Sequence, residues 1–324
     1  MHVLICGGAG YVGSHMAKWM ASRGFTVSVL DNLSTGHRAA VQWSDLLEVN
    51  LLDKHALDQV FSAGPIDAVM HFCARSLVGE SVVEPYQYYE NNVVGTLNLL
   101  QAMRKHGVDR LVFSSTAAVY GHPEMDHIDE EHRKAPINPY GMSKLMVEHM
   151  LADAAAAYGL RSVSLRYFNA AGASEDAEIG EAHEPETHLI PNVLKSVLGQ
   201  GAALKIFGDD YPTPDGTCVR DYVHVDDLAQ AHELALRYMD THEGAHAFNL
   251  GSGEGYSVRE VMSVAERVTG RSVPYEVAPR RAGDPAVLVA SSSRARRELG
   301  WQPKYNELGA IIESAWRWHV NRKF

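Results

Sequence analysis

The chain has 324 residues, 46% of them hydrophobic and 21% charged, which is typical of a globular protein. The formal net charge of −11 argues against nucleic-acid or anionic-membrane partners, because either needs a basic face. No apolar run approaches the roughly 20 residues of a membrane helix, and the start MHVLICGG lacks a basic signal-peptide region. Cys6, Cys73 and Cys218 are too few and too scattered for a disulfide framework or a zinc site, so we expect a cytoplasmic protein without a metal.

Short apolar runs bounded by turn residues predict the strands of a buried sheet. They are HVLIC (2–6), TVSVL (26–30), LLEV (46–49), DAVMHF (67–72), RLVFSS (110–115) and SVSLRYF (162–168). Between them, residues 84–106 and 137–158 carry helical periodicity. This alternation predicts an α/β fold with a doubly wound parallel sheet of Rossmann type, which binds ligands at the carboxyl ends of its strands.

The alternation loosens after about residue 170. The polar segment 171–187 is expected to be a surface loop, and Pro191 is expected to open a helix. Ser257 and Glu260 have the spacing of a capping box. We therefore expect a first domain over 1–170 and a smaller C-terminal α/β lobe mainly over 171–324, with a segment near 221–231 returning to the first domain.

A glycine-rich segment, CGGAGYVGSH, follows the first predicted strand. Gly8, Gly10 and Gly13 match G-x-G-x-x-G, and Gly7 extends the match to the related G-x-x-G-x-x-G spacing. Such glycines let the backbone approach a pyrophosphate at a helix N-terminus. Asp31 lies 18 residues after Gly13, where a carboxylate accepts ribose hydroxyls and repels a 2′-phosphate, so NAD is favoured over NADP. The alternative is a plain glycine turn with a helix-capping aspartate.

The stretch NPYGMSK places Tyr140 one helical turn before Lys144. Oxidation of an alcohol needs a base, and a phenol that works near neutral pH needs about 4 kcal/mol of stabilisation of its anion. An ammonium at about 5 Å supplies roughly 3 kcal/mol, and a positively charged nicotinamide supplies the rest. Thr116, at the end of the fifth strand, offers a hydroxyl to a substrate oxygen. The alternatives are a solvated helix pair and a strand-end turn residue.

Segments from the whole chain occur in the order of a known family: GGAGYVGSH, LDNLSTG, FSSTAAVYG, PYGMSK, RYFNAAG, VRDYVHVDDLA and PRRAGDP. They resemble the extended short-chain dehydrogenase/reductase family, and within it the nucleotide-sugar 4-epimerases. The resemblance implies that UDP-galactose and UDP-glucose are interconverted. Tyr140 would take the proton of the sugar 4-hydroxyl while a hydride leaves C4 for bound NAD. A 4-keto intermediate would rotate and be reduced on its other face.

The resemblance also implies how the ligands are held. Lys144 would hold the nicotinamide ribose and lower the pKa of Tyr140, while Thr116 would bind the 4-oxygen. NAD in the first domain would contact Gly7, Gly10, Tyr11, Val12, Gly13, Asp31, Asn32, Asn50, Leu51, Phe72, Asn91, Tyr140, Lys144 and Tyr167. The UDP-hexose in the C-terminal lobe would contact Thr116, Tyr140, Asn169, His188, Leu189, Phe207, Arg220, Arg281 and Asp284. Taken singly, Phe72 and Phe207 are equally consistent with core positions, and Arg220 with a surface pair to Asp221.

Three further expectations follow from the resemblance. Leu288 stands where a larger residue narrows the pocket beside the sugar C2 group, so UDP-N-acetylhexosamines are expected to be accepted as well. Ala117 and Ala118 replace the acidic pair of related dehydratases, which disfavours that rival, although another NAD-dependent nucleotide-sugar epimerase or dehydratase stays open. The resemblance implies a homodimer built on 84–106 and 137–158, and the alternative is that their apolar residues pack within the chain. A different class, a non-catalytic NAD-binding redox sensor, would not need Tyr140 and Lys144.

Overall fold

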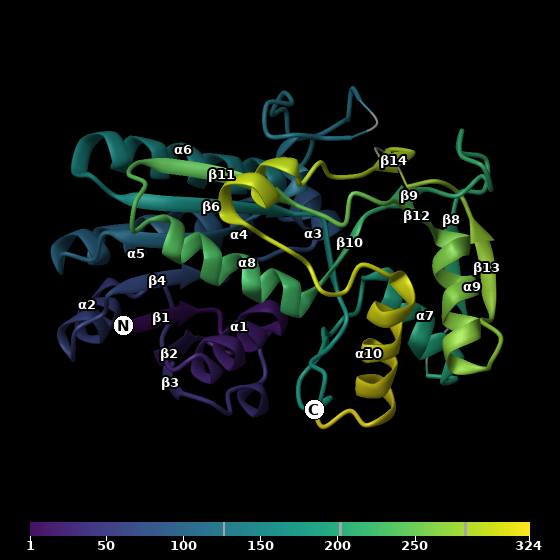
Figure 1. Ribbon diagram of the computed structural model, residues 1–324, viewed down its shortest axis with the longest axis horizontal. Coiled ribbons are helices and arrows are strands. Elements are labelled where there is room, and N and C mark those ends of the chain that lie inside the picture. Colours follow the sequence, from purple (N-terminus) through teal and green to yellow (C-terminus); the bar gives the residue numbers. More distant parts are fainter. Residues whose placement is uncertain (126, 201–202, 282–283) are drawn as a thin grey trace.

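A parallel sheet of seven strands, in the order β11-β6-β5-β4-β1-β2-β3, forms the centre of the larger part of the molecule (Figure 1). The computed structural model describes residues 1–125, 127–200, 203–281 and 284–324. The strands are β1 (His2–Cys6), β2 (Thr26–Asp31), β3 (Asp45–Glu48), β4 (Ala68–His71), β5 (Arg110–Thr116), β6 (Arg161–Tyr167) and β11 (Ala245–Leu250). All six predicted strands are present, and the predicted α/β fold of Rossmann type is confirmed.

Helices cover both faces of this sheet, because its strands are apolar on both sides. Val3 and Ile5 of β1 face α1 (Tyr11–Ser22) and α8 (Val225–Tyr238), while Leu4 and Cys6 face the opposite core. That opposite core is closed by α2 (Lys54–Ser62), α5 (Gly95–Lys105) and α6 (Pro139–Tyr158). The carboxyl ends of all seven strands therefore meet at one edge, between two layers of helices.

The helix predicted over 84–106 is divided into three. Its parts are α4 (Pro85–Tyr88), a π-helical segment (Tyr89–Val94) and α5, preceded by the short α3 (Val78–Val83). The π-helical segment packs against α6. The second predicted helix is α6, which starts where the Asn138 side chain accepts a hydrogen bond from the Gly141 amide.

Small sheets of two or three strands and three helices form the opposite end of the molecule (Figure 1). The strands are β7 (Asn169–Ala171), β8 (Leu204–Phe207), β9 (Val219–Arg220), β10 (Tyr222–His224), β12 (Tyr256–Ser257), β13 (Tyr275–Ala278) and β14 (Val287–Leu288). The helices α7 (Leu189–Val197), α9 (Val258–Thr269) and α10 (Leu308–Val320) share one apolar core. Two 3-10 turns, Arg38–Ala40 and Ala117–Val119, and a second π-helical segment, Ala295–Leu299, complete the regular structure of the described residues.

Several expectations for the second half of the chain can be compared with this arrangement. The capping box of Ser257 and Glu260 is confirmed. Pro191 lies two residues inside α7, which begins at Leu189. In the predicted returning segment 221–231, β10 pairs with β7 and not with the large sheet, whereas α8 packs on α1. The strand that joins the large sheet beside β6 is β11, further along the chain. The domain boundary near residue 170 stays a prediction.

The segment 171–187 is irregular, as expected for a loop, but the expectation that it lies on the surface is wrong for half of it. Glu181 and Ile179 are buried, and the Trp318 indole donates to the Glu181 carbonyl at 3.0 Å. The Lys18 ammonium pairs with Asp176. Among the described residues, no helix is long and apolar enough to cross a membrane.

Candidate active site

The glycine-rich loop between β1 and α1 leaves no room for a side chain at Gly7 or Gly13. Gly7 has φ +86°, and a Cβ there would lie 2.7 Å from the backbone of Phe72 and Cys73. A Cβ on Gly13 would lie 2.1 Å from the Gly7 carbonyl oxygen. Gly10 is the N-cap of α1 and makes no side-chain cap, so the helix start, with Tyr11, Val12 and Gly13, keeps amide donors for an anion. This backbone fits a dinucleotide pyrophosphate.

The other predicted cofactor residues lie at the carboxyl ends of neighbouring strands. Asp31 ends β2, is buried, and accepts from the Ala9 amide at 2.9 Å, so its carboxylate is held beside the glycine-rich loop. Asn32 follows it, and Asn50 and Leu51 follow β3. Phe72 follows β4 and lies 4.9 Å from the His232 ring, measured between ring centroids. A row of polar and apolar groups thus runs along one sheet edge, as a nucleotide requires.

Thr116, Tyr140 and Tyr167 lie together at the end of β5 and β6. The register pairs Thr116 of β5 with Tyr167 of β6. Tyr140 is on the first turn of α6, and its phenol lies close enough to Thr116 for the threonine hydroxyl to lower the pKa of the phenol. Lys144, one turn further along α6, is buried, with its Nζ 6.0 Å from the centre of the Tyr140 ring. The predicted catalytic group is therefore spatially contiguous.

Burial dominates the electrostatics of this group. It raises the pKa of Tyr140, against the lowering effect of the neighbouring Thr116 hydroxyl. It also lowers the pKa of Lys144 to about 7, although Cys73 and Glu148 act in the opposite direction. The expected lowering of the Tyr140 pKa by Lys144 is not found, because burial raises that pKa and only Thr116 acts against it. A phenolate here needs more positive charge than Lys144 supplies.

Ser114 connects Lys144 with Tyr167, and we did not predict it from the sequence. The Lys144 ammonium donates to the Ser114 carbonyl oxygen at 2.7 Å, and the Ser114 hydroxyl is hydrogen-bonded to the Tyr167 hydroxyl. Ser114 is an ordinary buried residue of β5, so only the strand register reveals this role. Asn91, in the π-helical segment, donates to the side chain of Asn92 at 2.9 Å.

Four of the residues predicted to bind the substrate in the second half of the chain contact one another in two pairs. Arg220 forms an ion pair with Asp284, and the Arg281 guanidinium lies 4.0 Å above the Phe207 ring. The Arg220–Asp221 surface pair considered above is not formed. Asp221 is buried and accepts from the amides of Ser252, Gly253 and Ala290.

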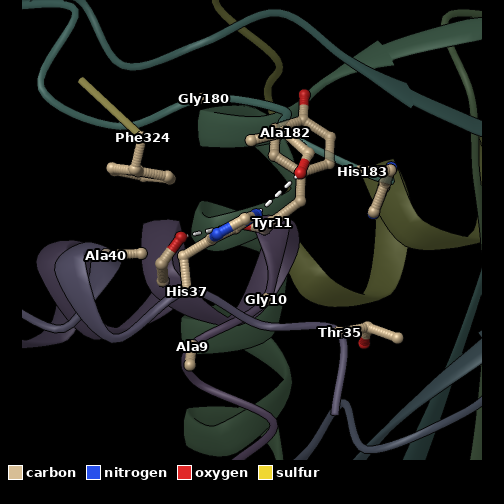
Figure 2. A pocket seen from close by; sticks show the side chains of 11 residues that line it. Ala9, Gly10, Tyr11, Thr35, His37, Ala40, Gly180, Ala182, His183 and Phe324 are labelled. Carbon is tan, nitrogen blue, oxygen red and sulfur yellow. Dashed lines mark hydrogen bonds between the residues drawn. The ribbon is translucent and has the colours of Figure 1, made fainter. Parts of the chain in front are cut away.

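Asn169 joins the same region through its side chain, which donates to the Asp221 carbonyl oxygen at 2.8 Å. Leu189 is the first residue of α7, and His188 precedes it. The imidazole of His188 is directed to Glu181, away from the contacts of Arg220. A small pocket beside the glycine-rich loop, lined by Tyr11, His183 and Phe324 among others, does not include Tyr140 or Lys144 (Figure 2).

Comparisons with known proteins agree with this geometry. Residues 3–251 match the model of the NAD dependent epimerase/dehydratase family. The UDP-glucose 4-epimerase of Corynebacterium glutamicum is 52% identical over 318 residues, covering 98% of this chain and 95% of the relative. The crystal structure of UDP-glucose 4-epimerase from Brucella ovis in complex with NAD is 50% identical, with a TM-score of 0.95 and coverage of 98% and 97%. A UDP-Glc/GlcNAc 4-epimerase from Campylobacter jejuni is 42% identical, with a TM-score of 0.86 and coverage of 99% of both chains.

Proposed function

Because the chain belongs to the NAD dependent epimerase/dehydratase family, we propose that it interconverts UDP-galactose and UDP-glucose at C4, with NAD as its cofactor. The proposal is supported by relatives of that name over nearly the whole chain and by the group of Thr116, Tyr140 and Lys144 at the sheet edge. The contact between the Tyr140 phenol and Thr116 is the observation that carries it. An alcohol oxygen at that place would meet a base and a hydroxyl donor together.

The cofactor would be held by the glycine-rich loop and the strand ends. The α1 N-terminus binds the pyrophosphate, and Asp31 with Asn32 accepts from the adenosine ribose. Asn50 and Leu51 lie at the adenine, and Phe72, Asn91 and Tyr167 line the remainder of the cofactor. When bound, NAD supplies a reversible hydride acceptor and a positive charge beside Tyr140.

The residues of the chain carry the proton transfer. Tyr140 removes the proton of the sugar 4-hydroxyl, and Thr116 holds the oxygen from which it is taken. Lys144 binds the nicotinamide ribose and contributes its charge to the Tyr140 anion. Because a neutral 4-keto sugar forms and is reduced in the same place, the reaction has no net oxidation.

The UDP moiety would lie in the C-terminal lobe. Arg220 and Arg281 donate to the diphosphate, since guanidinium groups bind phosphate oxygens in pairs. Asp284 contacts the uridine ribose, and Phe207 stacks near the uracil. Asn169, His188 and Leu189 complete the sugar-nucleotide side, so residues 1–170 bind mainly NAD and residues 171–324 mainly the substrate.

The second candidate substrate class is the UDP-N-acetylhexosamines. Leu288 pairs with Arg220 in register, and it packs beside the core of Val119, Tyr120, Ile128 and Leu145. A leucine leaves more room there than an aromatic side chain. The Campylobacter jejuni relative, named for both Glc and GlcNAc substrates, supports this extension.

We also propose a homodimer formed through α5, α6 and the π-helical segment. Leu99, Met103, Val147 and Leu151 from this region are used in the core of the chain. Val94, Leu97 and Met146 are exposed on the same helices. An apolar surface of this kind on two adjacent helices is suited to a second copy of the chain.

The test is conversion of UDP-galactose to UDP-glucose, followed by proton NMR, by the protein and two tyrosine variants. Tyr140→Phe should lower turnover by about 10²–10⁴-fold, which is the usual contribution of a general base. Tyr158→Phe, on the same helix but exposed, is the matched control and should retain full activity. Full turnover by Tyr140→Phe would disprove the assignment of the base, and no conversion by the unaltered protein would disprove the function.

A further inference from the structure

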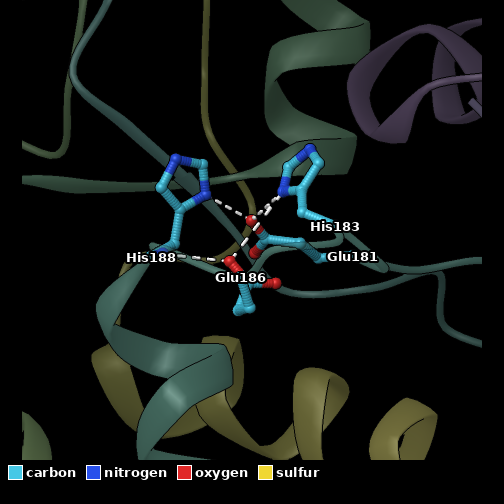
Figure 3. A group of neighbouring side chains, drawn as sticks. All are labelled: Glu181, His183, Glu186 and His188. Carbon is cyan, nitrogen blue, oxygen red and sulfur yellow. Dashed lines mark hydrogen bonds and ion pairs between the residues drawn. The ribbon is translucent and has the colours of Figure 1, made fainter. Parts of the chain in front are cut away.

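Two glutamates and two histidines converge on the loop before α7. Glu181, His183, Glu186 and His188 each direct one ligand-type atom to a common centre, and these atoms lie within 4.8 Å of one another (Figure 3). The His183 Nδ1 is 3.0 Å from Glu181 Oε1 and 3.9 Å from Glu186 Oε1. The Nδ1 of His188 is in contact with the same oxygen of Glu181.

We propose that these four side chains form a structural binding site for a divalent transition-metal ion, with zinc as the best fit. Zinc prefers four nitrogen, sulfur or oxygen ligands in a tetrahedron, at about 2.0–2.2 Å for histidine nitrogen and carboxylate oxygen. Ligand atoms around such an ion are about 3.3 Å apart, and small side-chain rotations produce this spacing from the distances given above. With neutral imidazoles the four ligands carry two negative charges, which match a divalent cation.

Burial of the two carboxylates is an independent reason for a cation. The side chains of Glu181 and Glu186 are 4% and 3% exposed. Within the described residues, Glu186 Oε2 is buried without a hydrogen-bond partner, and Oε1 accepts from the amides of Thr187 and His188 at 2.9 Å. Burial of a carboxylate is costly unless a positive charge compensates it. His183 and His188 are 33% and 47% exposed, which gives an ion access from solvent.

The position of this cluster indicates what the ion would do. The loop is held by the His37 imidazole, which is hydrogen-bonded to the Ala182 carbonyl oxygen at 2.7 Å. The His183 ring is also in edge contact with Tyr11, at the start of α1, with 6.2 Å between ring centroids. His188 caps α7. An ion at the cluster would therefore fix the loop between the start of α1 and the start of α7.

The expectation of a protein without a metal rested on the scattered cysteines and did not consider these residues. Their spacing, E-x-H-x-x-E-x-H, lies in a segment that composition alone assigns to the surface. Of the four ligands only His188 is also assigned to the sugar-nucleotide side, so the variants that test the site are made at His183 and Glu186, which have no role in the proposed epimerase activity.

The test uses the full chain, treated with a chelator and then titrated with ZnCl₂ or CoCl₂. We expect one ion per chain, visible absorption bands of tetrahedral Co²⁺, and a higher melting temperature that chelator reverses. His183→Gln and Glu186→Gln should each weaken Zn²⁺ binding by more than about 100-fold. Glu184→Gln, at an exposed residue of the same loop, and His55→Gln on α2 are controls that should bind as the unaltered chain does.

Two results would overturn the proposal. The first is the absence of both the Co²⁺ bands and the melting shift in the unaltered chain, a measurement that needs no variant to fold. The second is equal Zn²⁺ affinity in His183→Gln, Glu186→Gln and the two controls, since the ion would then be bound elsewhere.

Discussion

Replacement of Lys144 by methionine should stabilise the fold while it impairs catalysis. Burial lowers the Lys144 pKa from 10.5 to about 7, and that difference corresponds to about 5 kcal/mol of penalty on the charged form. The native state bears this cost in full below about pH 7, where both native and unfolded states are protonated. Between about pH 7 and pH 10.5 the unfolded state binds more protons, so stability rises with pH.

The variant removes this penalty but leaves the Ser114 carbonyl oxygen without its 2.7 Å donor, which costs about 1–3 kcal/mol. We therefore expect Lys144→Met to be more stable than the unaltered protein by about 2–4 kcal/mol near pH 6. As the pH approaches 10.5, the pKa of an unburied lysine, the gain should give way to a loss of about 1–3 kcal/mol, because only the missing hydrogen bond then remains. Urea unfolding across this range measures it, with the exposed Lys134→Met as control. A stability difference that does not change with pH would refute the reasoning.

Three other changes should separate the parts of the site. Gly13→Ala should cost more than about 3 kcal/mol of unfolding free energy and weaken NAD binding, because its Cβ would overlap the Gly7 carbonyl. Gly10→Ala is the control: the atom nearest to its Cβ is 3.5 Å away, so urea unfolding should show a loss below about 1 kcal/mol. Arg220→Met should raise the KM for UDP-galactose by about 10–100-fold with a smaller effect on kcat, as measured by initial rates. Leu97→Glu should shift sedimentation from dimer to monomer, whereas Val277→Glu on β13 should leave the dimer intact.

The sheet could be predicted from the sequence because its strands are buried on both faces and so read as continuous apolar runs. The close backbone approach at Gly7 and Gly13 was predictable for a similar reason, since only glycine fits it, whereas the ribose contact of Asp31 stays a prediction. The helix interruption at Tyr89–Val94 was not, because a π-helical segment differs from an α-helix only in its hydrogen bonds and not in its apolar pattern.

Contacts between distant parts of the chain limited the other predictions. Composition placed 171–187 at the surface, but Trp318 and Lys18 bind this segment from far away in the sequence. The expected activation of Tyr140 considered the charges of Lys144 and of nicotinamide, but not the burial that raises the Tyr140 pKa. The helical spacing correctly placed Tyr140 and Lys144 next to each other on α6. Their pKa values depend on burial by the surrounding layers, which the spacing does not show.

Because Lys144 does not offset that burial, proton removal by Tyr140 requires the positive charge of bound NAD. The hydride must then pass from the sugar to that NAD and return to C4. The most direct measurement uses UDP-galactose with deuterium at C4, converted in unlabelled water and analysed by mass spectrometry and NMR. The account predicts UDP-glucose that retains deuterium at C4. Product that has exchanged its C4 label with solvent would contradict it.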